Sequence, residues 1–144
     1  MLYEIDPLCW CDIMPKRNYT YIIPKDIVRN PEKHEITATK ILANYFKVNI
    51  VFVKKNNNIK TTDIDINGRI WEMKSPTGCG KHTVQHQFNR ARKQSSFIIL
   101  CSRRTKISDS SFKKQCLKHF KESSYFKGLI IISKTGEIIL ELYK

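Results

Sequence analysis

The chain has 144 residues, of which 41% are hydrophobic and 27% charged, as in an ordinary globular domain and unlike a disordered or fibrous protein. No apolar run approaches the ~18 residues of a membrane span, and acidic side chains stand near the start, where a secretory signal would be apolar. The five cysteines are an odd number without CxxC spacing, which argues against a disulfide framework and against a zinc ribbon.

The net charge is the strongest signal in the composition. The chain carries 26 Lys and Arg against 13 Asp and Glu, a net charge of +13. This surplus predicts a polyanionic partner such as nucleic acid. The alternative is a lysine-rich proteome that spreads solvated charge over the whole surface, and composition leaves both open.

Cys9 and Cys11 are interpreted as free thiols rather than as a shared metal site.

The N-terminal part predicts an irregular arm followed by a single domain. Residues 1–29 contain three prolines and no sustained period, so they predict at most short extended pieces, whereas residues 30–144 are long enough for one core. Asn30 followed by Pro31 predicts the start of a helix, and the residues that follow suit a helix to about Phe46.

Glu35 interrupts the apolar face of this predicted helix. It stands one turn before Ala38, on the side that carries the apolar residues. A carboxylate on a core-facing side is costly unless it is paired or bound to a metal ion. Glu35 is therefore either at the rim of the first turn, where water reaches it, or functional.

The next segment predicts a strand and then a hairpin. Residues 48–54 are β-branched and aromatic, and the asparagines at 56–58 predict a turn. Residues 61–74 read TTDIDINGRIWEMK, two alternating runs joined by Asn67 and Gly68. Asn-Gly between such runs predicts a two-residue type I′ turn, and this turn fixes which residues face each other.

In that register Asp63 stands directly opposite Glu72, and both share one face with Asp65 and Lys74. The other face carries the apolar residues Ile64, Ile66, Trp71 and Met73. Opposed like charges are destabilising, and a divalent cation such as Mg²⁺, held by Asp63 and Glu72, would compensate them. Lys74 is then placed to hold an attacking water or to stabilise charge on a phosphate. The alternative is a hairpin that displays charges on a solvated face.

A glycine-rich loop follows and leads into a second predicted helix over about residues 82–93. The loop lacks the glycine and the Ser or Thr that a nucleotide-binding P-loop requires. It can still hold a substrate phosphate on backbone N–H groups. The side chains predicted to bind substrate here are Lys81, Thr83, Arg90 and Lys93, with an ordinary solvated face as the alternative for the basic ones.

The remaining residues predict a strand, a helix and a closing hairpin. The strand covers residues 97–100, the helix covers 111–121 with a cap from Ser108 to Ser110, and the hairpin arms cover 128–133 and 137–142. The predicted order is therefore α, β, β, β, α, β, α, β, β. The fold class is α/β, with an αβββαβ core and an extension of one helix and one β-hairpin.

The first six elements match the core of the PD-(D/E)XK nuclease fold, which is similar to that of restriction endonucleases. Over about residues 34–100 the chain resembles the C-terminal tRNA nuclease domain of contact-dependent growth inhibition toxins. One departure is Thr62, where the motif usually has proline. The residues that carry the resemblance are His34, Glu35, Thr62, Asp63, Ile64, Asn67, Gly68, Trp71, Glu72, Lys74, Ser75, Pro76, Gly78 and Gln94.

The resemblance implies a metal-dependent endonuclease that acts on tRNA in the cytoplasm of a target cell and is neutralised by an acidic immunity protein. The residues that would carry the activity are Glu35, Asp63, Glu72 and Lys74, with metal held by Asp63, Glu72 and Glu35, and Gln94 contacting substrate. Mg²⁺ is the expected ion, with Mn²⁺ or Zn²⁺ as alternatives. Two other functions stay open, a DNA endonuclease of the same fold and a non-catalytic basic module that binds nucleic acid.

Overall fold

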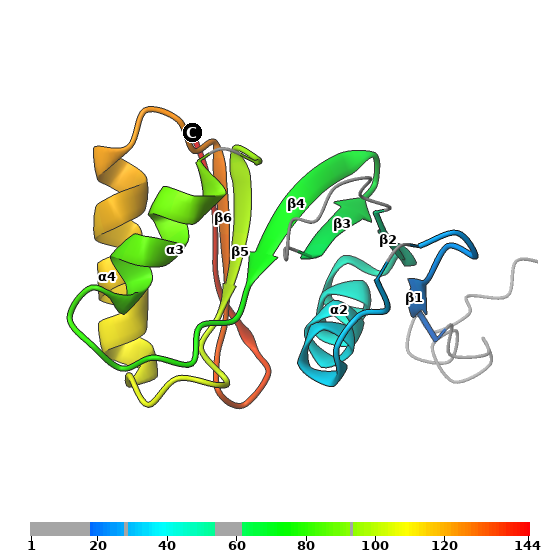
Figure 1. Cartoon of the computed structure of the whole chain (residues 1–144), viewed down its shortest axis with the longest axis horizontal. Helices are drawn as coiled ribbons and strands as arrows, with labels where there is room; N and C mark the ends of the chain where they lie inside the picture. The colour runs from blue at the N-terminus through cyan, green and yellow to red at the C-terminus, as the bar shows by residue number, and fades with distance from the viewer. Residues whose placement is uncertain (1–17, 28, 54–61, 93) are drawn as a thin grey trace, which may run out of the picture.

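The structure is a computed structural model that describes residues 18–27, 29–53, 62–92 and 94–144 (Figure 1). Several predictions concern residues outside these ranges: the turn at 56–58, the thiols of Cys9 and Cys11, the substrate contact by Lys93 and most of the arm at 1–29. The arm does contribute one short strand within its described part, and the predicted boundary at residue 29 stays a prediction.

The described residues form a mixed α/β structure with one seven-stranded sheet, whose strands lie side by side in chain order. The strands are β1 (Tyr21–Ile22), β2 (Ile50–Phe52), β3 (Thr62–Ile66), β4 (Arg69–Lys74), β5 (Phe97–Cys101), β6 (Gly128–Ile132) and β7 (Ile138–Tyr143). The helices in the same residues are α2 (Lys33–Phe46), α3 (Thr83–Ala91) and α4 (Asp109–Glu122). The pairs β1–β2, β4–β5 and β5–β6 are parallel, and the others are antiparallel.

The helices cover opposite faces of the sheet. Figure 1 shows α3 and α4 beside β5 and β6, and α2 beside β2, β3 and β4. Each face of the sheet carries an apolar core: the α2 cluster, which includes Leu42, and the α3 and α4 cluster, which includes Phe88 and Phe112. Side chains of β5 alternate between the two, because Ile99 packs in the α2 cluster while Ile98 and Leu100 pack in the α3 and α4 cluster. Burial of these two apolar faces holds the layers together.

The predicted hairpin is confirmed in every pair. Asn67 and Gly68 have φ angles of 53° and 84°, as a type I′ turn requires, and Asp63 pairs with Glu72. The apolar face is packed as predicted, and the structure shows that it packs against α2. Asp65, which was placed with the acidic face, accepts a hydrogen bond from the Gly68 N–H at 2.7 Å, so its carboxylate stabilises the turn.

The predicted start of the first helix was wrong by two residues. The helix begins at Lys33, and its N-cap is Glu32 rather than Asn30. The reason is a capping box, in which the Glu35 carboxylate accepts a hydrogen bond from the Glu32 N–H at 2.8 Å. The following strand begins at Ile50 rather than Val48, because the Val48 N–H donates to the Ala43 carbonyl and closes the helix end.

The other element bounds either agree with the predicted ones, as at Phe46, Phe97 and Gly128, or differ from them by one or two residues. The second helix ends early, at Ala91, because the N–H groups of Gln94 and Ser95 both donate to the Ala91 carbonyl and close the last turn. Ser108 caps α4 as predicted, since its hydroxyl accepts from the Ser111 N–H at 3.3 Å.

Candidate active site

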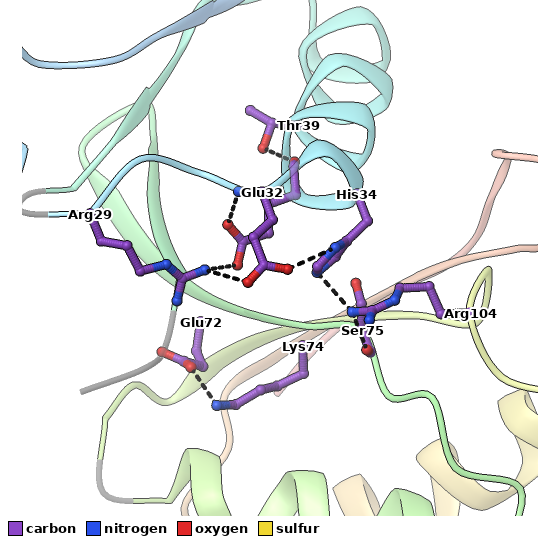
Figure 2. Close-up of polar contacts among 9 residues, drawn as sticks. Arg29, Glu32, His34, Thr39, Glu72, Lys74, Ser75 and Arg104 are labelled. Atoms are coloured by element: carbon purple, nitrogen blue, oxygen red, sulfur yellow. Dashed lines mark hydrogen bonds and ion pairs between the residues drawn. The ribbon is translucent and has the colours of Figure 1, made fainter. Parts of the chain in front are cut away.

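Asp63 and Glu72 form a buried acidic pair near the open end of the β3–β4 hairpin. Asp63 is 8% exposed and Glu72 is 0% exposed. Lys74 follows on the same face of β4, and its Nζ lies 2.9 Å from Glu72 Oε1 (Figure 2). Because Glu72 and Lys74 pair in register with Ile98 and Leu100, they point to the face of the sheet that α3 and α4 cover.

The surroundings of Glu72 favour its protonated form. Burial raises the pKa of Glu72 to about 8, and the hydrogen bond and negative charge of Asp63 act in the same direction. The ammonium of Lys74 opposes this rise in pKa. The metal-free site therefore binds a proton more tightly than an exposed carboxyl group does, and this proton reduces the repulsion between the two carboxyl groups.

Glu35 is buried in the first turn of α2 and is 8% exposed. Besides the Glu32 N–H, its carboxylate contacts the Arg29 guanidinium, with Nη2 2.8 Å from Oε1. Glu35 lies in the first turn, mostly buried and paired with Arg29, and both readings of it, the rim and the functional one, stay open. The side chain has a structural role in capping the helix, and the pocket described below brings it to the same cavity as Lys74.

The arrangement of the acidic side chains shows which of them could hold a metal ion together. In residues 18–27, 29–53, 62–92 and 94–144, no group of three or more His, Cys, Asp and Glu side chains is arranged to hold an ion. Asp63 and Glu72 lie together, whereas Glu35 is turned to Arg29. Two carboxylates completed by water and phosphate oxygens have the donor chemistry that suits Mg²⁺, and metal binding by Asp63, Glu72 and Glu35 stays a prediction.

Three pockets of about 400, 330 and 320 Å³ share Ser75 and Arg104 in their linings, and neither Asp63 nor Glu72 lines any of them. Lys74, which lines the 330 Å³ pocket, connects them to the acidic pair. We call them together the basic groove. The 330 Å³ pocket reaches Lys74 and Glu35, and the 320 Å³ pocket reaches the glycine loop at Gly78. The basic side chains that line the groove include Arg29, Lys33, Lys74, Arg90, Arg103 and Arg104.

The structure brings some of the predicted substrate-binding residues to the groove and leaves others away from it. Thr83 and Arg90 line it, on the first and last turns of α3. Thr83 packs against the glycine loop, where a Cβ on Gly78 would lie 2.8 Å from its hydroxyl oxygen, so the close approach requires glycine. Lys81 is exposed, and neither Lys81 nor Gln94, which follows α3, is among the residues that line these three pockets.

Arg104, which lines all three pockets, was not predicted from the sequence. Its Nη1 lies 3.0 Å from His34 Nε2 and donates to the Ser75 carbonyl at 3.5 Å (Figure 2). A guanidinium has no acceptor, so His34 Nε2 accepts and the ring proton is on Nδ1, 3.3 Å from Glu32 Oε2. A usable signal was its position just after β5, because open α/β sheets bind ligands beyond the carboxyl ends of their parallel strands.

Fold and site together define a mixed α/β domain with a buried acidic pair beside a basic groove. The family model of the contact-dependent growth inhibition CdiA C-terminal domain matches residues 60–138, more than half of the chain. The chain therefore belongs to this family of contact-dependent growth inhibition toxin domains, which act in the cell that receives them.

A solved structure has a similar fold, the CdiA-CT/CdiI toxin and immunity complex from Burkholderia pseudomallei. The similarity has a TM-score of 0.60 at 16% sequence identity and covers 85% of this chain and 98% of the matched one. No match was found among curated proteins. None of the helices in the described ranges is long and apolar enough to cross a membrane.

Proposed function

We propose that the chain is a metal-dependent endonuclease of the PD-(D/E)XK type, a toxin that hydrolyses phosphodiester bonds in tRNA. The observation that carries the proposal is the buried Asp63–Glu72 pair, with Lys74 at 2.9 Å from Glu72 and the basic groove beside it. The order α2, β2, β3, β4, α3, β5 supports the nuclease core. A module that only binds nucleic acid has no use for a buried acidic pair next to its phosphate-binding groove.

Asp63 and Glu72 would hold the divalent cation, with Glu35 as the third candidate from the same cavity as Lys74. Such an ion supplies a water of lowered pKa and offsets negative charge on the phosphate. Mg²⁺ suits a carboxylate pair best, and Mn²⁺ or Zn²⁺ are the alternatives.

The protein's own groups would bind and orient the phosphate. Lys74 links the buried pair to the groove, so its ammonium is placed to stabilise charge that develops on a phosphate there. Arg90 and Thr83 line the groove on the side of α3 and would hold the neighbouring backbone. The burial of Glu72 keeps bulk water from its carboxyl group, which strengthens each charge interaction at the site.

The resemblance favours tRNA over DNA as the substrate. The B. pseudomallei toxin was solved as a complex with an immunity protein. We expect this chain to be neutralised by an immunity protein too. Because the chain carries a net charge of +13, a protein that covers the groove should be acidic.

The decisive experiment is cleavage of total tRNA and of plasmid DNA with Mg²⁺, Mn²⁺, Zn²⁺ or EDTA. The parent should cleave tRNA with an added ion and not with EDTA. Glu72→Gln, Asp63→Asn and Lys74→Met should each lower the rate by about 100-fold or more. The matched control is Asp65→Asn in the same hairpin, which keeps an acceptor for the Gly68 N–H and should cleave normally.

Cleavage of plasmid but not of tRNA would move the proposal to a DNA endonuclease. Near-parent cleavage by a folded Glu72→Gln variant would falsify the assignment of the acidic pair. Binding of both nucleic acids without cleavage under every ion would favour the non-catalytic module.

A further inference from the structure

Arg104 occupies the place where the parts of the basic groove meet. The 400 Å³ pocket extends from it toward Lys33 and Arg103, the 330 Å³ pocket toward Lys74, and the 320 Å³ pocket toward Thr83 and the glycine loop. A polyanion that follows the groove from the glycine loop to α2 must therefore pass Arg104.

Contacts within the protein orient the guanidinium of Arg104 but engage only one of its three nitrogen atoms in hydrogen bonds within the described residues. Both of its hydrogen bonds come from Nη1, to His34 Nε2 at 3.0 Å and to the Ser75 carbonyl at 3.5 Å. In the described part of the chain, Nε and Nη2 make no hydrogen bond. A guanidinium carries five N–H donors in a planar fork that fits a phosphate, so Arg104 keeps donors for a ligand while its position is fixed.

The backbone that carries Arg104 is held in place from both sides. Asp109 accepts from the Ser102 hydroxyl at 2.6 Å and from the Lys134 N–H at 3.1 Å. The Lys134 ammonium donates to the carbonyl of Ser102 at 2.9 Å and to that of Thr105. The Thr105 hydroxyl donates to the Gly78 carbonyl and so connects this loop to the glycine loop. A binding residue on such a fixed loop loses little conformational entropy when a ligand arrives.

We propose that Arg104 binds a backbone phosphate of the nucleic acid, next to the phosphate that lies at Lys74. This inference rests on the proposed nuclease function for the identity of the ligand, and on the geometry above for the residue. A guanidinium can donate several hydrogen bonds in one plane to a phosphate, whereas a lysine ammonium acts as a point charge. Binding should therefore depend on arginine at this position and not only on a positive charge.

Binding is measured first, in EDTA, with a fluorescein-labelled single-stranded RNA and with total tRNA as probes. Arg104→Ala should weaken binding by about tenfold or more. It should also lower the slope of log K against log salt by about 1. Arg104→Lys should recover part of this loss. The matched control is Arg92→Ala, which removes the same charge from an exposed position at the C-cap of α3, outside the lining of the groove, and should change binding little.

Cleavage with Mg²⁺ or Mn²⁺ is measured second, on the same variants, after melting curves have shown that they fold. If Arg104→Ala does not fold, Arg104→Gln and Arg104→Lys decide the question. Binding and cleavage by Arg104→Ala that equal those of Arg92→Ala overturn the proposal. A parent that binds RNA but cleaves nothing refutes the nuclease function alone, because the binding series still decides the role of Arg104.

Discussion

Glu72 shows how the chain tolerates two opposed carboxyl groups before any ligand binds. The strand register alone predicts repulsion between Asp63 and Glu72 and suggests that a cation must relieve it. In the structure Lys74 lies 2.9 Å from Glu72, and burial together with Asp63 raises the pKa of Glu72 to about 8. Lys74 and the raised pKa of Glu72 therefore reduce the repulsion in the hairpin without a metal ion.

The raised pKa of Glu72 predicts that the metal-free protein loses stability as the pH rises. Between the ordinary value of 4.5 and about 8, the folded protein binds more protons at Glu72 than the unfolded chain does. The free energy of unfolding must then fall as the pH rises through this window, because raising the pH disfavours whichever state binds more protons, and here that is the folded state. Urea unfolding in EDTA across the window measures it.

Glu72→Gln is the control for this pH dependence, since glutamine stays neutral at every pH and keeps the shape of the side chain. The variant should show a flatter profile than the parent and should be the more stable of the two near the upper end of the window. Identical slopes for both proteins would mean that Glu72 titrates as an exposed glutamate does.

At the scale of elements, the register of the β3–β4 hairpin was predicted correctly, and the reason is that all its information is local. Asn67 and Gly68 determine the turn, and alternation then assigns each side chain to a face. The start of α2 was predicted less well, because a proline signal at Pro31 competed with the capping box of Glu32 and Glu35. Which of two local signals prevails depends on contacts such as Arg29 with Glu35, and those are not visible in the pattern.

The turn gives a prediction for stability that needs no knowledge of function. Gly68 has φ of 84° and open space around the position of a Cβ, so Gly68→Ala meets only backbone strain and should cost roughly 1–2 kcal/mol. Gly80→Ala is the matched control, because that glycine lacks a positive φ and its nearest neighbour would lie 3.8 Å away. It should change the free energy of unfolding by less than ~0.5 kcal/mol. Equal melting temperatures for both variants would contradict the type I′ assignment.

At the scale of the whole molecule, the sequence predicted the acidic pair and, in Thr83 and Arg90, one side of the groove, but not its other side. Asp63, Glu72 and Lys74 belong to one hairpin, whereas the groove combines the segment before α2, the end of β4, α3 and the loop after β5. Loop residues such as Arg104 have no period or motif to mark them. They are brought to the site only by the parallel pairing of β4 and β5, which places the ends of these strands at one edge.

For the whole molecule, the question is whether the net charge of +13 acts through a defined binding surface or through positive side chains spread over the whole protein. We compare two triple variants that each remove three positive charges. One replaces Arg90, Arg103 and Arg104 of the groove with Gln, and the other replaces the exposed Lys114, Lys118 and Lys121 of α4.

If phosphates lie in the groove, its triple variant releases fewer counterions when it binds, so log K against log salt should become shallower by about 2 to 3. The α4 triple variant should keep most of the parental slope, because lysines outside the contact neutralise few phosphates. Fluorescence titration of labelled tRNA in EDTA at several salt concentrations measures both slopes. Equal losses in the two variants would show that the positive charge acts as a diffuse field, and the nucleic acid would then lack a defined path through the groove.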